Sequence, residues 1–204
     1  MATLYVLMGI PASGKSMMSD RLVKEKNCWL FSSDIIREEM QYDASVDAQN
    51  DSLFDYMYAR IRTELDKGVD IVLDATNTYA VYRRKIFKAV GHQHQIICIL
   101  LMRQLDNCLK ANRQRPQFIK EEVICQMYAE FDLPSVAEGF DQIEICYPDN
   151  DEFVLDEEAW KRADNGHIRG YLYMFCANKE SDRAARLQSA RKIAESENAY
   201  FINS

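Results

Sequence analysis

A phosphate-binding loop is the strongest chemical signal in this 204-residue sequence. Residues 9–16 fit the pattern G-x-x-x-x-G-K-[ST] and lie between an apolar run and a helical pattern. In such a loop the glycines allow tight backbone turns around an anion, the lysine reaches phosphate oxygens and the serine hydroxyl binds Mg²⁺. An ordinary strand–turn–helix is the alternative, and the flanking elements favour the phosphate loop. We expect a nucleoside triphosphate to contact Gly9, Ile10, Pro11, Ala12, Ser13, Gly14, Lys15, Ser16 and Met17.

Two aspartates follow predicted strands at the edge where parallel sheets bind ligands. Asp34 comes after residues 28–31, and Asp74 ends residues 69–74. One carboxylate could take a proton from an attacking hydroxyl, and the other could hold the metal or its waters. We expect Asp74, together with Ser16, to be the metal residue. Because both aspartates precede helical patterns, a helix N-cap is the alternative at each position.

Three arginines are candidates for contacts to phosphate. Arg37 lies one helical turn after Asp34, where its guanidinium could bind a phosphate of the acceptor. A surface pair with a neighbouring carboxylate is the alternative. Arg113 and Arg115 lie at the end of a helical pattern that Pro116 terminates. This segment is typical of a lid that closes over a triphosphate, with a solvated basic turn as the alternative.

The elements that must position these residues alternate along the chain. Apolar strands separated by helices predict an α/β doubly wound domain, with five parallel strands covered on both faces. We expect this P-loop NTPase fold over residues 1–147, with the lid within it, and a helical extension over residues 148–204 packed on the same domain. The predicted strands are residues 3–8, 28–31, 69–74, 95–102 and 142–146, and the main helices are residues 15–26, 47–67, 81–90, 105–112 and 121–131.

Composition narrows the function classes. No apolar run approaches the ~18 residues that cross a bilayer, so we expect no membrane segment. The N-terminus lacks a signal-peptide pattern, which makes the cytoplasm the default location. The six cysteines are scattered without a C-x-x-C pair, so we interpret them as reduced core residues.

The formal net charge of −7 is unevenly distributed. Residues 121–160 carry thirteen acidic residues and no lysine or arginine, so the rest of the chain sums to +6. This tract is either a solvated face or a device that limits nonspecific nucleic-acid binding. In the second case a positive funnel, to which Arg37, Arg83 and the lid contribute, remains at the active site.

Five segments together resemble the 5′-hydroxyl polynucleotide kinase branch of the P-loop kinases. They are residues 9–16, 32–37, 74–77 with Arg83, 112–116 and 138–140, in the family order and within residues 1–147. The resemblance implies ATP and Mg²⁺ bound through Lys15 and Ser16, and Asp34 as general base for the 5′-hydroxyl. It implies an acceptor-phosphate contact for Arg37 and a donor clamp for Arg115. The family lid often has two arginines four apart, and since Ala111 occupies the earlier position, Arg113 is the substitute.

Three functions follow as hypotheses. The first is an ATP-dependent kinase of the 5′-hydroxyl end of DNA or RNA. The second keeps phosphoryl transfer but changes the acceptor to a small molecule or to the hydroxyl of an aminoacyl-tRNA. The third is a P-loop ATPase or switch module, against which the Asp34–Arg37 pair and the arginine lid argue.

Overall fold

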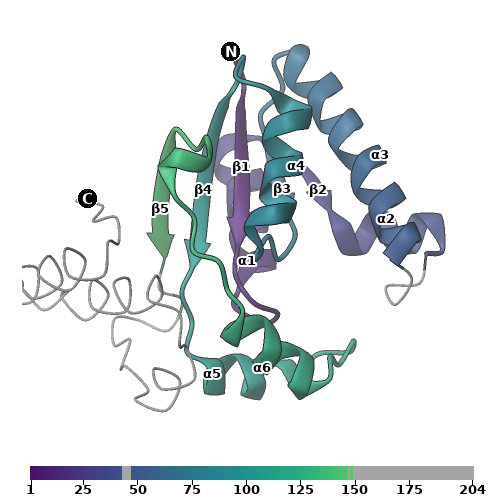
Figure 1. Ribbon diagram of the computed structural model, residues 1–204, viewed down its shortest axis with the longest axis vertical. Helices are drawn as coiled ribbons and strands as arrows, with labels where there is room; N and C mark the ends of the chain where they lie inside the picture. The colour runs from purple at the N-terminus through teal and green to yellow at the C-terminus, as the bar shows by residue number, and fades with distance from the viewer. Residues whose placement is uncertain (43–46, 147, 149–204) are drawn as a thin grey trace, which may run out of the picture.

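The computed structural model describes residues 1–42, 47–146 and 148, which form a five-stranded sheet with helices on both faces (Figure 1). The predicted helical extension, apart from Pro148, and part of the acidic tract lie outside these residues. The elements in chain order are β1 (Thr3–Met8), α1 (Lys15–Lys26), β2 (Trp29–Ser32), α2 (Ser33–Met40), α3 (Asp47–Asp66), β3 (Ile71–Asp74), α4 (Ala80–Val90), β4 (Gln95–Leu101), α5 (Leu105–Asn112), α6 (Glu121–Ala129), the 3₁₀ helix η1 (Val136–Glu138) and β5 (Gln142–Cys146).

All neighbouring strands of the sheet are parallel, in the order β2-β3-β1-β4-β5. The predicted fold class is thereby confirmed. β1 lies at the centre, so the loop that follows it opens at the middle of the sheet's carboxyl edge. β3, which ends at Asp74, lies directly beside β1. Asp74 is therefore brought next to the phosphate loop by strand order.

Some element ends differ from the sequence prediction because of hydrogen bonds at the helix ends. β3 begins at Ile71 rather than at residue 69, since the N–H of Val69 still donates to Glu64 of α3 (3.1 Å) after the left-handed turn at Gly68. β2 begins at Trp29 rather than at residue 28, since Asn27 ends α1 in a left-handed conformation.

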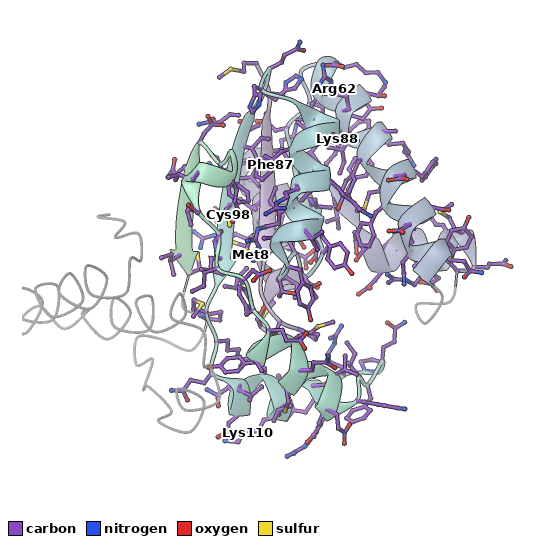
Figure 2. The ribbon with its side chains drawn as sticks, viewed as in Figure 1. Met8, Arg62, Phe87, Lys88, Cys98 and Lys110 are labelled. Carbon is purple, nitrogen blue, oxygen red and sulfur yellow. The ribbon has the colours of Figure 1, made fainter. Side chains whose placement is uncertain are left out.

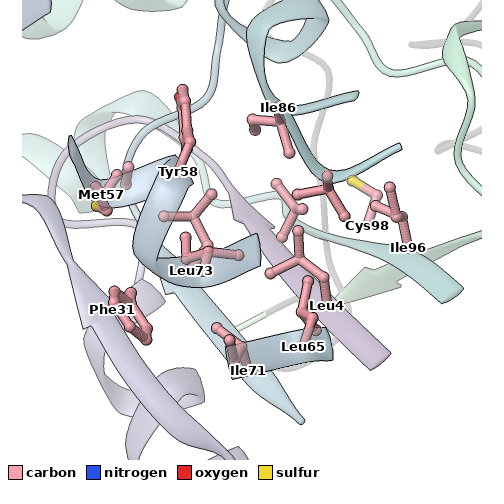
Figure 3. Close-up of a cluster of buried hydrophobic side chains, with 14 of the residues drawn as sticks. Leu4, Phe31, Met57, Tyr58, Leu65, Ile71, Leu73, Ile86, Ile96 and Cys98 are labelled. Carbon is pink, nitrogen blue, oxygen red and sulfur yellow. The ribbon is translucent and has the colours of Figure 1, made fainter. Parts of the chain in front are cut away.

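Alternate strand residues pack into two apolar layers. Leu4, Val6 and Met8 face the layer that includes side chains of α2, α3 and α4, whereas Tyr5 and Leu7 face the layer that includes Leu22 of α1. Figure 3 shows the first layer, in which Leu4, Ile71, Leu73 and Ile96 of the sheet meet Met57, Tyr58 and Leu65 of α3 and Ile86 of α4. Because the strands are parallel and both faces are packed in this way, the carboxyl ends of the strands lie at one common edge of the sheet.

The cysteines of the described part are unpaired, as predicted, and Cys28, Cys98 and Cys108 are buried. Cys176 lies outside the described residues. Among the helices that the structure describes, none combines the length and the apolar character needed to cross a membrane.

A buried ion pair joins α4 to the segment after α6. The Arg83 side chain is fully buried, and its Nε and Nη2 atoms donate to the two carboxylate oxygens of Glu138, each over 2.8 Å. Its remaining donors bind the carbonyls of Asn77, Asp132 and Leu133. The expected contribution of Arg83 to an exposed positive funnel is therefore wrong, because its charge is buried and neutralised within the fold.

Replacing Glu138 with alanine should lower the free energy of unfolding by about 3–5 kcal/mol, since it leaves the Arg83 charge buried without a counter-ion. Urea unfolding followed by circular dichroism measures this. The matched control is Glu25→Ala, which breaks the exposed Arg21–Glu25 pair and should cost about 1 kcal/mol or less. If both substitutions lower the free energy of unfolding equally, the buried pair contributes no more to stability than the exposed one.

Candidate active site

The loop between β1 and α1 has the geometry of an anion cradle. Gly14 has φ of 101° and Ala12 has φ of 62°, both in the left-handed region that turns successive N–H groups toward one side. At Gly9 the backbone passes so close to Ser13 that a Cβ would lie 2.5 Å from the Ser13 Oγ atom. The first turn of α1 contains no acidic residue, so its positive dipole end remains available to an anion.

Two polar side chains of this loop are buried in a way that fits a phosphate ligand. Among the described residues no partner satisfies the buried Ser13 Oγ. Lys15 is buried as well, and its Nζ donates to the carbonyl of Ile10 (2.9 Å). Burial lowers the pKa of Lys15 to about 8, although the negative charges of Asp74 and Asp34 oppose the shift. The residues present therefore fit a polyphosphate, whose charge would favour the protonated lysine.

This pKa predicts a pH dependence of nucleotide binding. A phosphate near Lys15 raises its pKa from about 8, so affinity should fall as pH rises above that value and binding should take up a proton. At about pH 9 we expect close to one proton per nucleotide, measured by titration calorimetry in buffers of different ionisation enthalpy. Lys15→Arg, which stays protonated at this pH, is the control and should show no such uptake. Equal uptake by the two proteins would assign the proton to another group.

Asp74 accepts hydrogen bonds from two hydroxyls of α1. Ser16 Oγ lies 3.1 Å and Ser19 Oγ 3.4 Å from its Oδ2 atom. Burial raises the pKa of this carboxyl, while Lys15 and the Ser16 hydrogen bond act in the opposite direction. A hydroxyl and a carboxylate are the hard oxygen ligands that Mg²⁺ prefers, so Ser16 and Asp74 fit this ion. Asp74 is no helix cap, since α4 is capped at Tyr79.

Asp34 and Arg37 lie on the first turns of α2. Asp34 is the second residue of this helix, whose N-cap is Ser32, so the N-cap alternative is wrong here too. Its carboxylate is largely exposed and accepts from Arg37 Nη1 (3.0 Å), while Arg37 Nη2 donates to Asn50 of α3 (3.3 Å). The alternative of a carboxylate pair for Arg37 is thus confirmed, and its partner is the candidate base itself. The contact to an acceptor phosphate stays a prediction.

The two lid arginines have different surroundings. We call residues 113–120, between α5 and α6, the lid loop. Arg113 forms an exposed ion pair with Glu121, with Nε–Oε1 and Nη2–Oε2 distances of 2.6 and 3.1 Å. Arg115 lies close enough to Lys15 for its charge to contribute to the lowered pKa of that lysine, behind the larger effect of burial. Of the two predicted clamp residues, Arg115 is therefore the one whose charge acts on Lys15, while Arg113 is paired with Glu121.

Four residues that sequence reasoning missed hold this site together. Asn77 Nδ2 donates to the carbonyl of Leu7 in β1 (2.8 Å), and Arg103 Nη1 donates to that of Ala12 in the phosphate loop (2.9 Å). Ser19 binds Asp74, and the fully buried Asn112 closes the lid loop. Asn77 and Asn112 lie within the segments 74–77 and 112–116 that carry the family resemblance. Ser19 also carries a sequence signal, because three residues after Ser16 it lies on the same helix face.

A family model and a curated protein both match this chain. The family model for the AAA domain matches residues 4–134. The L-seryl-tRNA(Sec) kinase of Methanococcus maripaludis is 28% identical over 165 residues, which cover 76% of this chain and 62% of that protein. This chain therefore spans less than two thirds of the length of that curated relative.

Two solved structures share the fold at low sequence identity. A sugar kinase from Janibacter sp. HTCC2649 superimposes with a TM-score of 0.59 and 12% identity, over 80% of this chain and 92% of its own. A fungal RNA kinase gives a TM-score of 0.54 and 10% identity, over 98% of each chain. At these identities the likeness concerns the architecture alone.

Proposed function

Since this chain belongs to the AAA domain family, whose model matches residues 4–134, we propose that it is a kinase that transfers the γ-phosphoryl group of ATP to a hydroxyl. The proposed acceptor is the 5′-hydroxyl end of DNA or RNA. The observation that carries this proposal is that Lys15, Asp74 and Asp34 lie close to one another at the phosphate loop. Ser32 of β2 is the register partner of Asp74 in β3, and Asp34 follows two residues after Ser32. The negative charges of both aspartates also oppose the lowering of the Lys15 pKa by burial. A nucleotide site thereby has a second carboxylate beside it that can accept the proton of an attacking hydroxyl.

On the donor side, the chain supplies a preformed anion cradle. The loop amides and Lys15 bind the β- and γ-phosphates, and Arg115 approaches from the lid. Ser16 and Asp74 would hold Mg²⁺, which would supply positive charge against the donor phosphates. Closure of the lid excludes water, so that the hydroxyl rather than water receives the phosphoryl group.

On the acceptor side, Asp34 takes the proton of the attacking hydroxyl. Arg37 holds its Oδ1 atom, and within the described part of the chain no hydrogen bond occupies Oδ2, which is the atom that would meet the acceptor. As the hydroxyl oxygen bonds to the γ-phosphorus, the bond between that phosphorus and the leaving ADP oxygen breaks, and the proton passes to Asp34. Arg37 then lies where it can pair with the phosphate that follows the terminal nucleoside.

The choice of a nucleic-acid end rests on Arg37 and on two of the relatives. A guanidinium beside the base suits an acceptor that carries a phosphate close to its reacting hydroxyl, as every polynucleotide end does. Both the fungal RNA kinase and the seryl-tRNA(Sec) kinase are named for action on RNA. The Janibacter protein, named as a sugar kinase, represents the small-molecule alternative.

A second candidate function is phosphorylation of the hydroxyl of an aminoacyl-tRNA. It is favoured by the 28% identity to the L-seryl-tRNA(Sec) kinase over 76% of this chain. Both functions use the same donor site and the same base. They differ in whether the reacting hydroxyl belongs to the end of the polynucleotide or to an esterified amino acid.

The acceptor is identified by transfer of radiolabel from γ-labelled ATP. The panel contains single-stranded DNA and RNA with 5′-hydroxyl ends, the same strands with 5′-phosphates as matched controls, seryl-tRNA and a simple sugar. We expect label only on strands with a free 5′-hydroxyl. Label that leaves tRNA with the amino acid on mild alkaline deacylation would establish the second function. Phosphate release at one rate with and without every acceptor would establish an ATPase instead.

A further inference from the structure

The lid loop is held in a defined shape by a buried side chain at its base. The Asn112 side chain is fully buried, and its amide forms two hydrogen bonds with the backbone of Ile119, over 2.7 and 3.2 Å. Ile119 itself packs against the cluster of Ile10, Cys108 and Ile124. Because both ends of the loop are fixed in this way, its side chains are presented in preset directions.

The loop presents an aromatic ring to solvent among positive charges. Phe118 is 58% exposed, although the next residue, Ile119, packs into the lid. Residues 107–120 contain four basic residues and no acidic one, and one of the four, Arg113, is paired with Glu121 just beyond them. Lys110 of α5 and Lys120 of the lid loop are both exposed, and Figure 2 shows Lys110 on the side of α5 that faces away from the sheet. An exposed ring with lysines close to it in the chain is a combination that suits single-stranded nucleic acid, through stacking and phosphate contacts.

The same loop borders the proposed transfer site. The charges of Arg115 in the loop and of Asp34 in α2 both act on Lys15, so these two segments lie around one phosphate site. Figure 1 shows α5 and α6 across the carboxyl edge of the sheet, where the strands end. Phe118 lies three residues beyond Arg115, so at most about 10 Å of extended chain separates the two residues.

We propose that the lid loop binds the part of a single-stranded acceptor that follows its terminal nucleotide, with Phe118 stacking on a base and Lys120 near the backbone phosphates. This inference rests on the proposed function and extends it, because it makes the enzyme prefer a polynucleotide to a mononucleotide. The lysines near Phe118 favour nucleic acid over an apolar protein as the partner, because lysine is depleted in protein–protein interfaces. Stacking is tolerant of base identity, so the preference is for length and single-strandedness rather than for sequence.

Anisotropy of a 3′-labelled, 5′-hydroxyl oligonucleotide tests the binding with the full chain. Phe118→Ala and Phe118→Leu should each weaken oligonucleotide affinity by about 5-fold or more, since leucine keeps apolar area but loses the aromatic face. Phe118→Trp should retain it. Val136→Ala, at an exposed apolar residue of η1, is the matched control and should leave it unchanged. Unchanged affinity in Phe118→Ala, or equal binding by Phe118→Leu and the unaltered protein, would overturn the stacking role.

Steady-state kinetics show which nucleotide of the acceptor contacts Phe118. In Phe118→Ala the KM for an oligonucleotide should rise, while the KM for a nucleoside 3′-phosphate and for ATP stays within about twofold. A matching rise for the mononucleotide or for ATP would overturn the assignment, because Phe118 would then contact the terminal base or the adenine. The two proposals remain separable. If the protein binds oligonucleotides through Phe118 but labels none of them, the binding role of Phe118 stands and the proposed function is wrong. If it labels 5′-hydroxyl ends and the Phe118 substitutions change nothing, the proposed function stands and the binding role of Phe118 is wrong.

Discussion

Replacing Asp34 with asparagine is expected to slow phosphoryl transfer by about 10²–10⁴-fold while nucleotide affinity stays unchanged. Asparagine keeps the size of the side chain and an oxygen that can accept from Arg37, but it cannot take a proton from the acceptor. Since Asp34 is largely exposed and no helix cap, the substitution should leave folding intact. Single-turnover transfer from γ-labelled ATP, with nucleotide affinity measured separately, checks this prediction.

Glu39→Gln is the matched control for Asp34, because it removes one exposed carboxylate from the same helix. Its transfer rate should equal that of the unaltered protein. If both substitutions slow transfer alike, the effect comes from the net charge of α2 and not from a base. Weakened nucleotide binding with normal turnover in Asp34→Asn would instead make Asp34 a residue of the donor site.

Replacing Lys15 with methionine should weaken nucleotide binding and slow transfer. Hydrogen bonds to charged groups contribute about 1.5–3 kcal/mol each, so nucleotide affinity should fall roughly 10- to 150-fold. Transfer should fall further, since the charge of this lysine also stabilises the transferring phosphoryl group. Fluorescence titration with a labelled nucleotide and the single-turnover assay measure the two effects.

Loss of fold would not explain such a result. In the structure the Lys15 ammonium is buried with the Ile10 carbonyl as its hydrogen-bond acceptor, and burial of a charge is unfavourable. We therefore expect the melting temperature of Lys15→Met to equal or exceed that of the unaltered protein. Lys24→Met, at an exposed position of the same helix, is the control for activity. Unchanged nucleotide affinity in Lys15→Met would refute the phosphate-loop assignment.

Much of the fold could be predicted because its signals are local. Residues 3–8 and 142–146 are apolar or alternating runs between turn residues, and the structure confirms them as β1 and β5 without a shift. The phosphate-loop pattern includes its own turn residues, so Gly14 was identified from spacing alone. Errors arose where a backbone hydrogen bond rather than a side chain decides an end, as at Val69, whose N–H continues the turn after α3.

Within the candidate site, the sequence determined which chemical groups are present and the tertiary structure decided which of them meet. Lys15 and Ser16 are placed by their own loop and helix, and strand order brings Asp74 to them over 58 positions. No local pattern separates Arg113 from Arg115, yet one pairs with Glu121 and the other lies near Lys15.

Arg83 shows the same division most clearly. In the sequence Arg83 is one more positive charge near a nucleotide-binding pattern. In the structure it is buried and pairs with Glu138, which lies 55 positions away. The physical reason is one of range. Backbone conformation and apolar periodicity depend on a few neighbouring residues, while the pairing and burial of a charge depend on which distant segments the packed sheet and helices bring together.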